Sequence, residues 1–356
     1  MARSRCPDAT HTLLLEKHRE LDYLCRHPGE RIFISDWYCH HPFAKDYLPS
    51  DTFESPSESD LLQYCFQNDT SEIHEEIIIF HKHNDGVLLQ KEEIYVGAGM
   101  TPLLTAQMLM LKAKGFTGLY YAKPLYYAFY YLAHLLNIGL TPICDTPLNR
   151  PGVHVRLPRK KSCLIICDPL WYMGRYVLQE YMVALKAWQA QTGSLILVDG
   201  GFQYMRWDTT NRKEASSMFD RELTFRSICP TKALAVHGVR FSYTLLPRAY
   251  QEDMRYAYAN ACGSSCIFSH KAACRIMKVL NARDSNCELL RYIQGRYNQL
   301  VGRHVFIDDI GAEATYFVFA KLLGDASQYI AMGQEFFDTT NYPDHVRFNV
   351  LLRREL

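Results

Sequence analysis

One segment of the chain reads Ser227-Ile-Cys-Pro-Thr-Lys232-Ala-Leu-Ala-Val-His-Gly238-Val-Arg240-Phe-Ser-Tyr243. Residues typical of a strand precede Lys232, and a glycine and an arginine follow it at short spacing. This pattern predicts that a loop holds Lys232 with its amine directed into a pocket. Arg240 comes eight residues later and can return to the same pocket to bind an anion.

This pair of cations indicates one kind of chemistry. A lysine forms a Schiff base with an aldehyde when burial or a neighbouring cation lowers the pKa of its amine. An anion-binding arginine beside such a lysine favours a phosphorylated aldehyde, and pyridoxal 5'-phosphate (PLP) is the obvious candidate. A lysine can also lie near an arginine by chance, so the interpretation depends on what the rest of the chain supplies.

The bulk composition is that of an ordinary globular protein. The chain has 356 residues, 48% of them hydrophobic and 22% charged, which predicts one large domain and a smaller one. A formal net charge of +1 argues against nucleic acid as the main partner. The first residues lack the apolar core of a signal peptide, and polar residues interrupt the most apolar region, Leu119 to Leu140. We therefore expect a cytoplasmic protein without a membrane span.

The cysteines and histidines form no metal-binding pattern. The 12 cysteines are scattered, and the C-x3-C pairs at 163/167 and 262/266 have no matching second pair for zinc. Reduced thiols and no bound metal are therefore expected. His81 and His83 could contact a metal, but we place them on the polar side of a helix predicted over residues 72–83.

The order of helices and apolar runs predicts an α/β fold. Residues 1–60 are expected to be irregular, an N-terminal arm with part of a small domain. Residues 61–246 alternate helices with short apolar runs typical of buried parallel strands, which indicates an αβα three-layer large domain with a mostly parallel sheet. Residues 247–356 are expected to form the α+β small domain. The predicted strands cover 93–97, 118–123, 139–144, 162–167, 194–199, 224–229, 240–246 and 346–352, and the predicted helices 72–83, 102–114, 126–136 and 175–192.

The residues that follow these strands share a chemistry, since ligands of open α/β sheets bind at the carboxyl ends of the strands. Gly97-Ala-Gly99-Met-Thr101 precedes a helix whose N-terminus would favour a phosphate, although an ordinary glycine turn is the alternative. Tyr126 can place a ring at the pocket mouth or in the core. Asp199 follows an apolar strand, and a buried carboxylate there needs a cationic partner such as a protonated pyridine nitrogen.

In this order the positions resemble fold-type I PLP-dependent enzymes, in particular the class I/II aminotransferases. The resemblance runs from about Tyr64 to Arg347, nearly the whole chain. The segment from Leu62 to Thr101 looks like the family's tyrosine, helix and strand that lead into the phosphate loop. Lys232 and Arg240 with Gly238 between them look like its Schiff-base segment.

The resemblance implies a role for each of these residues. Lys232 would hold PLP as a Schiff base and move the substrate proton, Asp199 would pair with the pyridinium nitrogen, and Tyr126 would stack on the ring. Arg347 would form a bidentate pair with the substrate carboxylate. Tyr64 would reach the phosphate of a neighbouring subunit, because the family forms homodimers. The phosphate itself would be bound by Arg240 and the amides of Ala98, Gly99 and Met100.

The sequence departs from the family's pattern at three cofactor-binding positions. Trp171 replaces an asparagine, and Phe202 replaces a tyrosine, that both donate to the phenolic oxygen of PLP. Cys229 replaces a frequent serine or threonine. Trp171 could still donate through its indole N–H, and Tyr172 could substitute if the loop shifts by one residue. Losing both donors should raise the pKa of the lysine–PLP imine.

The resemblance implies a PLP-dependent aminotransferase-like transferase that acts on an amino acid through an external aldimine and a Cα carbanion. The alternative is a lyase, cyclase or oxidase that directs the same carbanion to elimination, replacement or oxygen-dependent oxidation. A third hypothesis is a non-catalytic relative of the fold, and the intact Lys232, Asp199, Arg240 and Arg347 argue against it. A nucleotide-binding Rossmann enzyme is disfavoured because Gly97-Ala-Gly99 lacks a third glycine.

Overall fold

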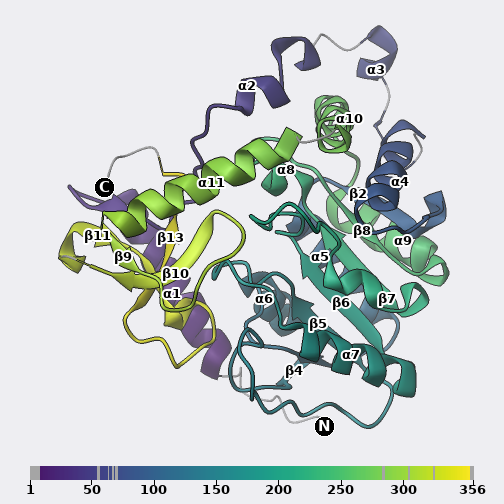
Figure 1. Ribbon diagram of the computed structural model, residues 1–356. Helices are drawn as coiled ribbons and strands as arrows, with labels where there is room; N and C mark the ends of the chain where they lie inside the picture. The colour runs from purple at the N-terminus through teal and green to yellow at the C-terminus, as the bar shows by residue number, and fades with distance from the viewer. Residues whose placement is uncertain are drawn as a thin grey trace.

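The computed structural model describes residues 9–53, 57–62, 64, 65, 68, 71–282, 285–303, 305–323 and 325–352. A seven-stranded sheet lies at its centre in the order β2-β8-β7-β6-β5-β3-β4 (Figure 1). Within this sheet only β8 runs against its neighbours, so the sheet is mostly parallel. The strands are β2 (Ile94–Gly97), β3 (Gly118–Tyr121), β4 (Gly139–Pro142), β5 (Cys163–Cys167), β6 (Leu195–Gly200), β7 (Thr224–Ile228) and β8 (Ser242–Leu245).

The three central strands are buried along their whole length. Every residue of β5, β6 and β7 is buried, which requires cover on both faces of the sheet. Helices pack along the sheet and provide that cover (Figure 1). They include α4 (Glu72–Asn84), α5 (Met100–Ala113), α6 (Tyr127–Leu135), α7 (Gln179–Thr192) and α9 (Gln251–Cys262). The predicted α/β fold with a mostly parallel sheet is confirmed.

One predicted helix begins later than expected. The helix predicted over residues 175–192 starts only at Gln179. The amide of Tyr176 donates to Glu313 and the amide of Val177 donates to Asp168, at 3.2 and 3.1 Å. These two carboxylates hold the segment extended, so the helix cannot start before it.

A second sheet follows in the C-terminal part of the chain. Its four strands lie in the order β12-β13-β10-β9 and pair antiparallel throughout. They are β9 (Phe306–Ile307), β10 (Phe317–Leu322), β12 (Met332–Gly333) and β13 (His345–Asn349), and β13 matches the late strand predicted over 346–352. Two long helices, α10 (Ile267–Asn281) and α11 (Ser285–Gly302), precede this sheet.

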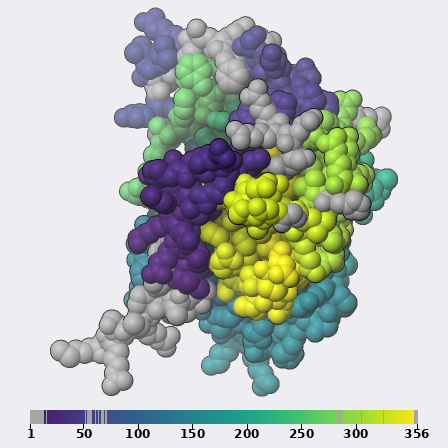
Figure 2. All heavy atoms as spheres, turned by 90° about the vertical axis from the view of Figure 1, so that its left-hand side faces the viewer, coloured from purple at the N-terminus to yellow at the C-terminus, as the bar shows by residue number. Residues whose placement is uncertain are grey.

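The N-terminal segment is not irregular as predicted. Residues Ala9–Arg26 form the helix α1, which lies beside the C-terminal strands (Figure 2). Leu14 and Leu21 of this helix are buried, and their seven-residue spacing places them on one helix face. The spacing is visible in the sequence, and the prediction overlooked it.

The strand pair β1 (Ile32–Phe33) and β11 (Tyr329–Ile330) ties the N-terminal segment to the C-terminal part in parallel register. Short helices α2 (Ala44–Tyr47) and α3 (Glu58–Leu62) follow β1. Among the described residues, no helix is both long and apolar enough to cross a membrane. The domain boundaries at residues 60 and 246 stay a prediction.

Candidate active site

A cavity of about 240 Å³ lies at the carboxyl ends of β6 and β7. Its volume is many times that of a single water, so it can hold a small molecule. The parallel strands bring their ends to one edge of the sheet, which places distant segments of sequence around one space. The sequence-predicted residues that line it are Gly99, Met100, Tyr126, Trp171, Asp199, Phe202, Cys229, Lys232 and Arg240.

Lys232 and Asp199 flank a single glycine. Lys232 lies on the short helix α8 (Pro230–Ala233), directly after β7, and Asp199 lies near the end of the neighbouring strand β6. A Cβ atom at Gly201 would lie 3.1 Å from Nζ of Lys232 and 3.2 Å from Oδ1 of Asp199. The amine and the carboxylate therefore converge on one point of the cavity wall.

Burial makes the Asp199 carboxylate unusual. Burial raises the pKa of Asp199, and the charge of Lys232 only partly opposes that effect. The Gly201 amide donates to Oδ1 at 3.2 Å, and the Cys167 thiol lies 3.9 Å from Oδ2. Without a closer cation the ionised form is disfavoured, and a cationic ligand placed beside Asp199 would stabilise it.

Arg240 packs against the N-terminus of α5. Gly99 caps this helix with φ of 99°, a conformation that favours glycine. A Cβ atom at Gly99 would lie only 2.8 Å from Nη2 of Arg240, so glycine is needed for the guanidinium to approach. A helix N-terminus with a guanidinium beside it is a favourable place for an anionic group.

Two amides at this turn have partners within the protein. The Ala98 amide donates to the Tyr258 hydroxyl at 2.7 Å, and the Gly99 amide donates to the Gly97 carbonyl at 2.9 Å. These two amides are satisfied within the protein, and Ala98 does not line the cavity. The predicted phosphate contacts of the Ala98, Gly99 and Met100 amides stay a prediction.

Aromatic rings form the walls of the cavity. The Tyr126 and Trp171 rings meet edge to face at 5.8 Å, and the Phe202 ring centre lies 4.3 Å from Nζ of Lys232. Trp171 is 5% exposed, and its Nε1 has no hydrogen-bond partner among the described residues. Tyr172 does not line the cavity, because its ring stacks on Phe337 at 4.0 Å.

Arg347 lies close to the cavity without lining it. It comes from β13 and is fully buried, and its guanidinium lies 4.4, 5.2 and 4.2 Å from the ring centres of Trp37, Trp171 and Phe317. Nη2 donates to the Ser35 carbonyl, whereas Nε and Nη1 have no partner within the described residues. Burial lowers the pKa of Arg347 to about 9, and the nearby Tyr316 and Asp36 only partly oppose that effect.

Tyr64 lies outside the cavity. Its side chain is 81% exposed, and it is not among the lining residues. The single chain thus does not bring Tyr64 to the predicted phosphate site, and its predicted contact across a dimer interface stays a prediction.

The sequence prediction missed seven of the residues that line the cavity, among them Trp37 and His237. Trp37 comes from the N-terminal segment, and His237 lies between Lys232 and Arg240. The His237 imidazole lies 3.4 Å from the Cys39 thiol and 3.1 Å from the Tyr316 hydroxyl, and burial lowers its pKa to about 4. His237 was visible inside the quoted lysine segment, whereas no local pattern marks Trp37.

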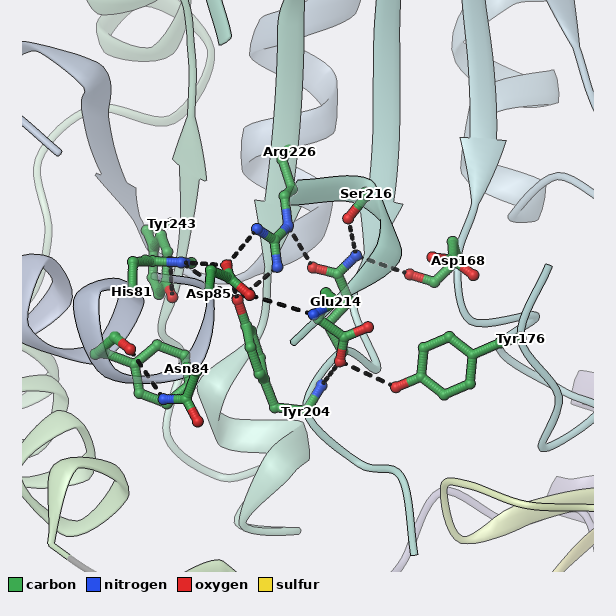
Figure 3. A network of polar contacts seen from close by, with 12 residues as sticks. His81, Asn84, Asp85, Asp168, Tyr176, Tyr204, Glu214, Ser216, Arg226 and Tyr243 are labelled. Atoms are coloured by element: carbon green, nitrogen blue, oxygen red, sulfur yellow. Dashed lines mark hydrogen bonds and ion pairs between the residues drawn. The ribbon is translucent and has the colours of Figure 1, made fainter. Parts of the chain in front are cut away.

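A buried ionic network, formed by His81, Asp85, Tyr204, Glu214 and Arg226, lies beside the same strands (Figure 3). Arg226 pairs with Asp85 at 2.6 Å, and Asp85 also accepts from His81 and Tyr204 at 2.9 and 2.8 Å. Burial alone would raise the pKa of Asp85, but the Arg226 charge and the His81 hydrogen bond bring it below its ordinary value.

The sequence predicted that His81 lies on the polar side of its helix, and this prediction is wrong. His81 is fully buried, and its two ring nitrogens face Asp85 and the Tyr243 hydroxyl at 2.9 and 2.8 Å. His83 is exposed. No group of three or more potential metal ligands occurs among the described residues.

Comparison with known proteins identifies the fold. No protein-family model and no curated protein matches the sequence. The N-succinyldiaminopimelate aminotransferase of Mycobacterium tuberculosis superposes with a TM-score of 0.76 at 15% identity, covering 94% of this chain and 92% of that one. YbdL of Escherichia coli, for which a methionine aminotransferase function was identified, gives a TM-score of 0.75 at 15% identity over 99% and 95%.

A PLP-bound structure from Clostridium difficile 630 gives a TM-score of 0.74 at 14% identity, covering 93% of this chain and 90% of that one. These similarities extend over nearly the whole of each chain. The protein therefore has the fold-type I, aminotransferase-like α/β fold that its sequence resembles.

Proposed function

We propose that the protein binds PLP through Lys232 and acts on an amino acid as an aminotransferase-type enzyme. The main support is that Lys232 and Asp199 both approach Gly201. The cavity that they line also contains Arg240, at the N-terminus of α5. A Schiff-base amine, a buried carboxylate and an anion site are the three groups that a phosphorylated pyridine aldehyde requires.

The residues present fit this cofactor. Arg240 with the amides of Ala98, Gly99 and Met100 would hold the phosphate, and Gly99 leaves room for the guanidinium. Asp199 would face the ring nitrogen, because its carboxylate is buried and the charge of Lys232 compensates it only in part. The Trp171 indole N–H, buried and without a partner in the described part of the chain, would donate to the phenolic oxygen. PLP, when bound, supplies an electron sink for the substrate's Cα.

The chain's own groups would then move one proton. Lys232, once its amine is released, would take the proton from Cα of the amino acid. It would then return the proton to the cofactor carbon on the other side of the amino nitrogen. Phe202 and Trp37 lie 4.3 and 5.8 Å from Nζ and would limit the positions that the amine can reach. Asp199 would keep its charge as long as a cation lies beside it.

Several finer assignments belong to this proposal. Arg347 would bind the substrate carboxylate, since two of its nitrogens lack a partner within the described residues. Tyr126 would pack on the cofactor ring from the cavity wall, and Cys229 would lie beneath the lysine loop. A homodimer with Tyr64 at the interface, a cytoplasmic location and domains that meet near residues 60 and 246 complete it.

Addition of PLP tests the central claim. The purified protein with PLP is expected to show a visible absorbance band that survives dialysis, and borohydride reduction is expected to attach the cofactor to Lys232 in peptide mapping. Lys232→Ala should lose both signals. Lys186→Ala, an exposed lysine of α7, is the matched control and should keep them. Attachment at another lysine, or an unchanged band in Lys232→Ala, would refute the proposal.

A second reaction is favoured by one observation. Phe202 presents an apolar ring 4.3 Å from Nζ, so one of the usual donors to the phenolic oxygen is missing and the carbanion could be directed to elimination, cyclisation or oxidation. Single-turnover experiments with candidate amino acids distinguish the reactions. Conversion of the cofactor to its amine form with release of a keto acid supports transamination, and release of ammonia supports a lyase or an oxidase.

A further inference from the structure

The Trp37 ring is in contact with both the cavity and Arg347. The Trp37 ring lines the cavity, and its centre lies 5.8 Å from Nζ of Lys232. The Arg347 guanidinium lies 4.4 Å from the same ring centre. Arg347 itself does not line the cavity, whereas the Trp37 ring both lines it and packs against the guanidinium.

The indole is held by its neighbours. Its ring is parallel to the Trp171 ring within 11° at 5.8 Å and meets the Phe317 ring edge to face at 5.0 Å. Arg347 is thus enclosed by the same three rings that hold each other in place. Contacts of this kind between a guanidinium and aromatic faces are attractive, and they strengthen when water is excluded.

The backbone around Trp37 is fastened on both sides. The Asn349 side chain donates to the carbonyls of Asp36 and Tyr38, each at 2.9 Å. The backbone amide of Met332 donates to the Ser35 hydroxyl at 2.9 Å. The Trp37 ring, by contrast, is 36% exposed. The exposed side of the residue thus offers space for the indole on the solvent side, while the segment that carries it is held by these hydrogen bonds.

Arg347 has the donors that a carboxylate would use. Nε and Nη1 have no partner among the residues that the structure describes, although the guanidinium is fully buried. Buried cationic donors without acceptors are costly, which favours an anion that reaches them. A carboxylate that enters from the cavity meets the rings that line it and pack near the guanidinium, and of these Trp37 is the nearer to Arg347.

We infer that Trp37 is a specificity-determining residue: its indole, packed on the guanidinium at the cavity wall, must move before a ligand carboxylate from the cavity can pair with Arg347. This inference rests on the proposed function, in which Arg347 receives the substrate carboxylate. Trp37 then sets how strongly the protein prefers a carboxylate over a neutral group of the same shape.

The test uses propionate and propionamide as probes, since they have nearly the same shape and differ in charge. Binding to the PLP-loaded protein and to its Trp37→Ala variant is measured by isothermal titration calorimetry. We expect the preference for propionate over propionamide to rise roughly tenfold in Trp37→Ala, because no aromatic contact has to be displaced. Loss of cavity wall affects both probes and cancels in the ratio. Tyr38→Ala, an exposed neighbour, is the matched control and should keep the wild-type ratio.

A second readout does not depend on that variant's folding. Saturating propionate should change the tryptophan fluorescence of the wild-type protein, and Trp37→Phe should lose this change, while propionamide should give none. An unchanged or lower preference in Trp37→Ala, or a propionate signal that persists in Trp37→Phe, would overturn the inference. The absorbance band of lysine-bound PLP is recorded in the same samples. Its absence from the wild-type protein would instead defeat the proposed function, so the two failures are distinguishable.

Discussion

The cavity at the ends of β6 and β7 and the buried ionic network beside the same strands differ in how their polar atoms are paired. In the network, no buried side-chain nitrogen or oxygen of His81, Asp85, Tyr204, Glu214 or Arg226 lacks a partner. Around the cavity, Nε1 of Trp171 and two nitrogens of Arg347 lack one within the described residues.

This difference separates structural from functional polar groups. A buried charge with its partners in place supports the fold, because removing either partner leaves the other uncompensated. A buried donor without a partner is a cost to the fold that a ligand can remove. Both regions touch the loop after β6, which carries Phe202 toward the cavity and Tyr204 toward the network.

The largest expected effect is on the network. Arg226→Met removes the partner of Asp85 and should lower the free energy of unfolding by about 3–5 kcal/mol, measured by urea denaturation of the cofactor-free protein. The double variant Asp85→Asn/Arg226→Met removes both charges and should recover part of the loss. A single variant as stable as the wild type would mean that the network is not a structural unit.

Replacing Asp199 should do the opposite of replacing Arg226: it should lower activity and leave stability unchanged. Asp199→Asn is expected to lower kcat about a thousandfold, on the order of 4 kcal/mol, because the cofactor ring loses its counter-charge. Burial raises the folded-state pKa of Asp199, so its contribution to stability is present only at low pH and is lost as the pH rises through that pKa. The cofactor-free variant should therefore melt no lower than the wild type at neutral pH. A variant that melts lower and keeps its activity would contradict the distinction between the two regions.

Glu214 gives the network a pH dependence. Burial, with the nearby Asp168, raises the pKa of Glu214 to about 7, while its unfolded value is ordinary. A raised pKa means that its stabilising contribution is complete at low pH and is lost as the pH rises from about 4.5 through 7. Relative to Glu214→Gln, the wild type should lose on the order of 2 kcal/mol over this window in denaturation curves measured at successive pH values. Parallel curves for the two proteins would show that Glu214 does not titrate there.

The pattern of the chain predicted the sheet and the cavity because both depend on local order. The buried runs of β5, β6 and β7 are continuous in sequence, and parallel strands bring whatever follows them to one edge. Lys232, Asp199 and Arg240 could be located in this way without knowing how distant segments pack.

Features that depend on distant contacts were not visible. Trp37 and Phe317 are 280 residues apart, and only the folded chain brings their rings together. His81 looks polar within its helix, and its burial follows from Arg226 and Tyr243 on strands far along the sequence. The amide of Ala98 carried no sign of its bond to Tyr258, because α9 supplies that hydroxyl from much later in the chain.

The smallest expected effect concerns the Trp171 indole. Trp171→Phe keeps an aromatic ring but removes the Nε1 donor, which has no partner in the described part of the chain. In the cofactor-free protein the lost contacts and the removed unsatisfied donor oppose each other, so stability should change by less than about 1 kcal/mol.

With PLP bound, the variant would lose one hydrogen bond, and we expect affinity for PLP to fall about five- to tenfold in equilibrium dialysis. The pH at which the visible band titrates should rise as well, since the donor favours the phenolate. Phe202→Leu, an apolar change on the same wall, should leave that titration unchanged. Equal PLP affinity and titration in Trp171→Phe and the wild type would show that the indole donor does not serve the cofactor, and unpaired buried atoms would then be a weaker sign of ligand binding in this molecule.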